Sequence, residues 1–121
     1  MPDRKRILVV DDEAIVRISC KRTLEPEGFD VDIASDGYEA IELIKNKAYD
    51  IIITDLKMPK MDGLEVLSWI KKNSPSSRVI VITGFSTPEI AEKSISAGAD
   101  KYLEKPFTPE TLISVVKDLL Q

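Results

Sequence analysis

Reactive side chains follow four of the apolar runs in this sequence. These side chains are Asp11 with Asp12, then Asp55, then Thr83 with Gly84, and finally Lys105 with Pro106. Asp55 comes directly after Ile51–Thr54, a run typical of a strand that is buried on both faces. A carboxylate in such a place is costly unless it is paired, hydrogen-bonded or bound to a metal. The sequence therefore predicts that Asp55 has a polar partner.

The three aspartates of this set indicate a metal site, provided that the fold brings them together. Two unit charges about 4 Å apart repel by roughly 4 kcal/mol at an effective dielectric near 20. A divalent cation removes this conflict, and ligands that are all oxygens, with room for water, suit Mg²⁺ better than a complete Ca²⁺ cage. An alternative is that Asp11, Asp12 and Glu13 cap the helix that follows. We prefer capping for Glu13, but it does not explain why Asp55 should join the aspartates.

Thr83 and Lys105 add a hydroxyl and an ammonium group to the acids. Phosphoryl transfer needs positioning, a metal that neutralises developing charge, and a cation on the transferring oxygens. Carboxylates do form aspartyl-phosphates, so Asp55 is a candidate nucleophile.

The elements that must position these residues are strands and helices in strict alternation. The predicted strands are Ile7–Val10, Val31–Ala34, Ile51–Thr54, Val79–Thr83 and Lys101–Glu104. The first, third and fourth are rich in Ile, Leu and Val, which favours the centre of a parallel sheet, and the other two alternate as edge strands do. This order predicts one α/β domain over residues 1–121, a doubly wound three-layer sandwich around a five-stranded parallel sheet. Ligands of such sheets bind beyond the carboxyl ends of the strands.

Two of the predicted helices have features that matter below. Thr108 and Pro109 are a strong N-cap and N1 pair for the last helix. The helix over Pro88–Ala97 has few apolar residues, which fits either a moving part or a short surface helix.

Composition excludes several classes of function. The chain has 121 residues, a net charge of −4, one cysteine and no histidine. Catalysis by a Ser-His-Asp set and zinc sites with histidine ligands are therefore excluded within this chain. The negative charge argues against nucleic-acid binding by this domain, and no run is apolar enough for a membrane span. The single cysteine and the lack of an apolar signal core lead us to expect a cytoplasmic protein.

These residues stand in motifs that resemble the receiver domain of two-component response regulators. The matching stretches are "ILVVDDE", "IIITDLKMPKMDGLEVL", "VIVITG" and "AGADKYLEKPF", and they cover essentially the whole chain. The resemblance implies a CheY-like, flavodoxin-like fold with strand order 2-1-3-4-5.

The resemblance also implies a role for each matching residue. Asp55 would be the phosphoacceptor, Asp12 a direct magnesium ligand, Asp11 an acid acting through water, and Lys57 a ligand through its backbone carbonyl. Thr83 and Lys105, helped by the Gly84 N–H, would bind the phosphoryl oxygens, and Mn²⁺ could replace Mg²⁺. Tyr102 would be the switch aromatic, although simple surface packing explains it as well. Pro106 is expected after a cis peptide bond, and Pro59 and Gly63 would shape the loop after the third strand.

The implied partner is a sensor histidine kinase or a histidine phosphotransfer protein. Such a domain promotes its own phosphorylation and dephosphorylation and is not a conventional enzyme. It would signal through the face of the fourth helix, fifth strand and fifth helix, to an effector domain or output protein, as a monomer or a phosphorylation-dependent dimer. The resemblance implies that the positions of Lys57 and Phe85 border the path of the hydrolytic water, and neither side chain offers a carboxylate or amide to orient it, which favours slow hydrolysis.

Three other functions fit the sequence less well. A haloacid dehalogenase-type phosphatase needs a second acid two residues after its nucleophile, where this chain has Lys57. A flavodoxin needs a hydroxyl-rich phosphate loop after the first strand, where this chain has acids. A degenerate receiver that acts as a phosphorylation-independent interaction module is disfavoured because every reactive position is filled. Whether the domain stands alone or belongs to a longer regulator stays open.

Overall fold

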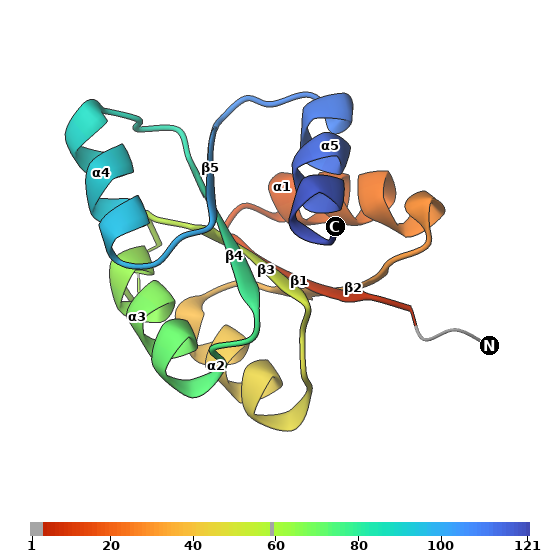
Figure 1. The fold of residues 1–121 in the computed structure, drawn as a ribbon, viewed down its shortest axis with the longest axis horizontal. Coiled ribbons are helices and arrows are strands. Elements are labelled where there is room, and N and C mark those ends of the chain that lie inside the picture. The colour runs from red at the N-terminus through yellow and green to blue at the C-terminus, as the bar shows by residue number, and fades with distance from the viewer. Residues whose placement is uncertain (1–3, 59) are drawn as a thin grey trace.

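The computed structural model describes residues 4–58 and 60–121, in which five strands alternate with five α-helices (Figure 1). The strands are β1 (Arg6–Val10), β2 (Asp30–Ala34), β3 (Ile51–Asp55), β4 (Arg78–Thr83) and β5 (Lys101–Glu104). The helices are α1 (Ala14–Leu24), the short 3₁₀ helix η1 (Glu25–Glu27), α2 (Gly37–Asn46), α3 (Gly63–Asn73), α4 (Pro88–Ser96) and α5 (Pro109–Leu119). Pro59, to which we gave a structural role, lies outside the described residues.

The strands form one parallel sheet in the order β2-β1-β3-β4-β5, as predicted. The two strands expected at the edges, β2 and β5, are at the edges. Central strands β1 and β3 are almost wholly buried, which explains why their sequences are near-continuous apolar runs. The order reverses between β1 and β3, and this switch point is where α/β sheets hold ligands.

Helices cover both faces of the sheet, with α1 and α5 on one face and α2, α3 and α4 on the other (Figure 1). Alternate residues of each strand supply the two cores because side chains along a strand point to opposite faces. In β1, Leu8 and Val10 face α2 and α3, whereas Ile7 and Val9 face α1 and α5. The predicted three-layer α/β sandwich is therefore confirmed.

Helix boundaries follow the capping residues. The Thr108 side chain accepts a hydrogen bond from the Thr111 N–H at the start of α5, as the sequence predicted. The α1 helix ends at Leu24, and the chain leaves η1 through Gly28, whose φ of 96° suits a glycine. None of the described helices is long and apolar enough to cross a membrane.

The α4 helix is thinly attached to the sheet, as its composition suggested. Ser94 is its one fully buried residue among those described, and its hydroxyl bonds back to the Ile90 carbonyl. Ile95 is 51% exposed. Since few apolar contacts hold this helix, it is among the elements most easily displaced.

Candidate functional site

The carboxyl ends of three neighbouring strands deliver acidic and hydroxyl side chains to one rim of the sheet. Asp55 is the last residue of β3, Asp11 directly follows β1, and Thr83 is the last residue of β4. All three are buried, with exposed fractions of 4%, 0% and 1%. Polar groups this deeply buried need compensating partners, as the sequence predicted for Asp55.

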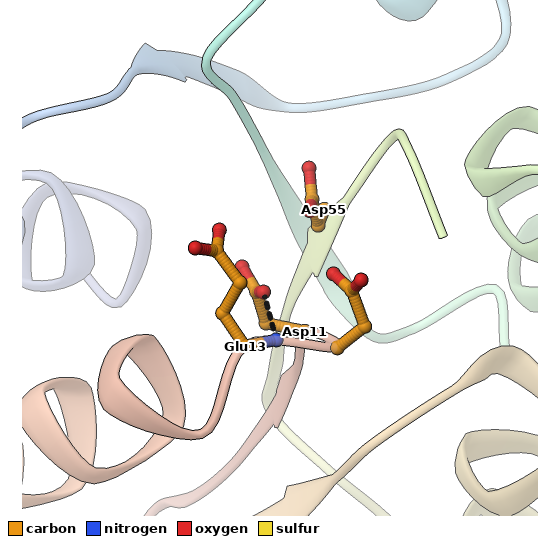
Figure 2. A group of neighbouring side chains, drawn as sticks. Asp11, Glu13 and Asp55 are labelled. Atoms are coloured by element: carbon orange, nitrogen blue, oxygen red, sulfur yellow. Dashed lines mark hydrogen bonds between the residues drawn. The ribbon is translucent and has the colours of Figure 1, made fainter. Parts of the chain in front are cut away.

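A fourth acid that sequence reasoning assigned to capping joins the group. Carboxylate oxygens of Asp11, Asp12, Glu13 and Asp55 lie within 4.8 Å of one another. Figure 2 shows the carboxylates of Asp11, Glu13 and Asp55 gathered beyond the ends of β1 and β3. Glu13 does occupy the N-cap position of α1, but its side chain makes no capping hydrogen bond. Glu13 therefore stands where capping was expected, but the expected capping hydrogen bond is not made.

Lys105 closes the group from the edge of the sheet. Its Nζ lies 2.8 Å from Asp11 Oδ2, 3.2 Å from Glu13 Oε1 and 3.3 Å from Asp55 Oδ2. The backbone N–H of Lys105 also donates to the Thr83 carbonyl at 2.8 Å, which ties this residue to β4. The Lys105–Pro106 peptide bond is cis. One ammonium group therefore meets three carboxylates.

The oxygen atoms of Asp11 are satisfied unequally. Oδ1 accepts the Glu13 N–H at 2.8 Å (Figure 2). Oδ2 is buried, and among the described residues its charged contact is Lys105 Nζ at 2.8 Å, an ammonium that it shares with Glu13 and Asp55. An under-satisfied carboxylate oxygen among other acids fits a hard cation that takes oxygen ligands. The residues present therefore fit Mg²⁺.

Burial and neighbouring charges shift the pKa values of Asp11, Asp55 and Lys105 in opposite directions. Burial raises the pKa of Asp11 and of Asp55, and Lys105 only partly offsets this effect. Burial by itself would lower the pKa of Lys105, but the neighbouring carboxylates, Asp11 foremost, raise it above its ordinary value. Lys105 is thus held firmly in its charged form, while ionisation of the two buried acids is costly.

The loops after β3 and β4 surround the acids with a second set of contacts. Asp55 Oδ1 accepts the Lys57 N–H at 3.4 Å, and Thr83 Oγ1 accepts the Phe85 N–H at 3.1 Å. The Lys57 ammonium lies 4.5 Å from the centre of the Phe85 ring, within range of a cation–π interaction. The exposed backbone of Gly84 lies between Thr83 and Phe85. These contacts join the two loops over the site.

Two further residues that the sequence singled out, Gly63 and Tyr102, make close contacts in the structure. A Cβ on Gly63 would lie 2.4 Å from Leu56 Cα and 2.6 Å from the Asp55 carbonyl oxygen, so the loop that carries Asp55 needs a glycine here. The Tyr102 hydroxyl donates to Ser86 Oγ at 2.9 Å. Sequence reasoning did not find Ser86, because nothing local marks a serine that bonds to a residue 16 positions away.

Comparison with known proteins identifies the family. Residues 7–117 match the model of the response regulator receiver domain, so the chain belongs to that family, as its motifs predicted. Response regulator MprA of Mycobacterium sp. (strain KMS) is 40% identical over 116 residues, which are 96% of this chain and 50% of that protein. Response regulator MprA of Mycobacterium leprae (strain TN) is 37% identical over 96% of this chain and 51% of that protein. The chain spans about half the length of these curated relatives.

Solved structures agree in fold. A CheY-like response regulator receiver domain protein from Methanospirillum hungatei JF-1 has a TM-score of 0.94 and 37% identity, over 98% of this chain and 94% of that one. The beryllofluoride-activated NtrC4 receiver domain dimer has a TM-score of 0.90 and 42% identity, over 94% of each chain. The CheY-like fold and membership of the receiver domain family are therefore established for this chain.

Proposed function

We propose that this domain takes a phosphoryl group on Asp55 from a phosphohistidine, on a sensor histidine kinase or a histidine phosphotransfer protein. The observation that carries the proposal is the position of Asp55, which is almost fully buried at a strand end, in contact with Lys105 and beside three other acids. A purely structural aspartate would not need that company, since Lys105 alone could balance its charge.

The transfer needs few groups. An Asp55 carboxylate oxygen attacks phosphorus, the P–N bond to the donor imidazole breaks, and its electron pair returns to the ring nitrogen. The Lys105 ammonium, the Thr83 hydroxyl and the Gly84 N–H bind the phosphoryl oxygens as they gain negative charge. A magnesium or manganese ion, when bound, would supply neutralisation of that charge. Its ligands would be Asp12, Asp55, the Lys57 carbonyl and, through water, Asp11.

The structure suggests how the switch would be read. A phosphoryl group on Asp55 carries about two negative charges, so it draws the Thr83 hydroxyl and Lys105 toward it. Thr83 then gives up the N–H of Phe85, which loosens the loop between β4 and α4. This loop also holds Tyr102 through Ser86. The change therefore reaches the face made by α4, β5 and α5.

The magnitude of such a switch is plausible. Moving a two-state domain from mostly inactive to mostly active takes roughly 5.5 kcal/mol of differential interaction. Hydrogen bonds to charged groups contribute about 1.5 to 3 kcal/mol each, so two to four of them are sufficient. The weak attachment of α4 keeps the opposing cost small.

The surroundings of the domain follow from the same proposal. We place it in the cytoplasm, where a phosphohistidine donor would meet it, with an effector domain or an output protein downstream. A related receiver is a dimer in its beryllofluoride-activated form, which supports dimer formation on phosphorylation.

The test is phosphorylation by a small donor. The protein is incubated with acetyl phosphate, with Mg²⁺ or with EDTA, and its intact mass is measured. We expect a Mg²⁺-dependent gain of one phosphoryl group, absent in Asp55→Asn and retained in Asp118→Asn, which removes an exposed aspartate of α5. If neither acetyl phosphate nor a panel of phosphohistidine donors modifies the wild type, and no Mg²⁺ binds, the domain is a phosphorylation-independent interaction module.

A further inference from the structure

The α1 helix starts differently from the other described α-helices. Side-chain caps begin those four, each accepting a backbone N–H of the first turn, and the capping residues are Asp36, Asp62, Thr87 and Thr108. Glu13 has the N-cap position of α1, but no side-chain cap bond is made, and the first turn of α1 has no acidic residue. A local rule that is broken at one place, next to a functional site, indicates that the residue serves another purpose.

The Glu13 carboxylate is directed at Lys105 instead of its own helix. Glu13 Oε1 lies 3.2 Å from Lys105 Nζ, a contact between residues 92 positions apart. The Glu13 backbone is fixed as well, because its N–H donates to Asp11 Oδ1. Its side chain is 58% exposed and that of Lys105 is 16% exposed, so Glu13 is the outermost of the three carboxylates around the ammonium.

The two buried partners of Lys105, Asp11 and Asp55, also have roles in metal binding and phosphorylation under the proposed function. Asp11 Oδ2 and Asp55 Oδ2, which touch the ammonium, belong to the acids that would hold Mg²⁺ and receive the phosphoryl group. Lys105 Nζ contacts oxygens of the acids that a divalent cation would use, so we infer that the ammonium shifts outward when the cation binds. Glu13 is the carboxylate that remains for it.

The structure also provides room for this movement. Glu13 and Lys105 line a hollow of about 300 Å³ on the α1 side of the site, together with Pro106 and Phe107. An ammonium group that moves toward Glu13 enters this hollow and stays near Asp55, where a phosphoryl oxygen would need it.

We propose that Glu13 is a positioning residue for Lys105, which holds the ammonium at the outer side of the acidic site and so allows a divalent cation to bind. This inference rests on the proposed function, since it concerns Mg²⁺ at the same site. It adds Glu13 to the residues of the site and gives a role to an N-cap side chain that makes no capping hydrogen bond.

The test measures Mg²⁺ affinity by isothermal titration calorimetry on the unphosphorylated protein, with thermal unfolding in EDTA alongside. Glu13→Ser supplies a good capping hydroxyl that is too short to reach Lys105. We expect it to weaken Mg²⁺ binding about threefold to fivefold, the size of a partly exposed ion pair, without lowering the melting temperature. Glu92→Gln removes one exposed charge of α4 as a control and leaves the affinity unchanged.

A second background separates positioning from direct effects of charge. In Lys105→Met, Glu13 has no ammonium to hold, so we expect Glu13→Ser to leave Mg²⁺ affinity unchanged there. If the loss of affinity persists in Lys105→Met, Glu13 acts on the ion directly and the inference is overturned. Unaltered affinity in Glu13→Ser alone also overturns it, with the proposed function intact. If the wild type binds no Mg²⁺, this inference fails together with the Mg²⁺ dependence in the proposed function, whereas phosphorylation of Asp55 is tested separately by intact mass.

Discussion

Replacing Asp11 with asparagine should stabilise the metal-free protein. The attraction between Asp11 Oδ2 and Lys105 Nζ, 2.8 Å apart, is roughly 6 kcal/mol at an effective dielectric of 20. Repulsion from Asp55, whose oxygen lies within 4.8 Å, removes roughly 3.5 kcal/mol or more of this. The remainder is smaller than the cost of burying an ionised carboxylate, which is several kcal/mol.

The variant keeps most favourable contacts of the site. Asparagine Oδ1 can still accept the Glu13 N–H, and Lys105 keeps Glu13 and Asp55 as partners once its ammonium turns away from the amide Nδ2 that replaces Asp11 Oδ2. We therefore expect Asp11→Asn to gain about 1 kcal/mol, or about 3 to 6 °C in melting temperature for a domain of this size. Thermal unfolding in EDTA at pH 7, followed by circular dichroism, measures this gain, with Asp118→Asn as a control.

The dependence on pH has a definite sign. Burial raises the pKa of Asp11 in the folded protein above its unfolded value. Between these two values the folded state holds more protons than the unfolded chain, so wild-type stability falls as pH rises through that window. The advantage of Asp11→Asn therefore grows as pH rises above the unfolded pKa and disappears below about pH 4. A melting temperature below that of the wild type, in EDTA at pH 7, would refute the reasoning, because the Lys105 contact would then outweigh burial.

Three other outcomes follow from the site and its loops. Gly63→Ala should lower the free energy of unfolding, measured in urea, by about 2 to 3 kcal/mol, because the new Cβ would lie 2.4 Å from Leu56 Cα. A smaller loss would mean that the loop after β3 adjusts easily. The phosphorylated protein should keep its phosphoryl group for minutes, because Lys57 lies over the Phe85 ring and neither side chain orients a water molecule. Phe85→Glu should shorten this lifetime in time-resolved mass spectra. A wild-type half-life of seconds would contradict the reasoning. Ser86→Ala should release the Tyr102 hydroxyl, with a change in the ring's NMR signals, and unchanged signals would show that packing alone holds the ring.

The fold was predictable because its main determinants are local and periodic. Alternation of apolar strands with amphipathic helices is visible in the sequence, and strand composition separated centre from edge. Three errors in the strand bounds were at strand starts, where Arg6, Asp30 and Arg78 are polar yet their backbones pair with neighbouring strands. A fourth was at the end of β3, which includes Asp55. A side chain at the end of a strand can be solvated while its backbone hydrogen-bonds, and residue type does not report that.

The residues of the candidate site could be predicted from the sequence, but the contacts among their side chains could not. Asp11, Asp55, Thr83 and Lys105 were found because parallel strands end on the same side of a sheet. Glu13 was misjudged because its position in the sequence is that of an N-cap.

By itself, the sequence determined the order of elements, the layers of the sandwich and the reactive residues at the rim, since these depend on periodicity and on strand direction. The tertiary structure alone decided that one ammonium, on Lys105, meets three carboxylates, and that Tyr102 is held by Ser86. Such contacts join residues far apart in the chain, and differences of about an ångström set their energies. No local pattern records that geometry.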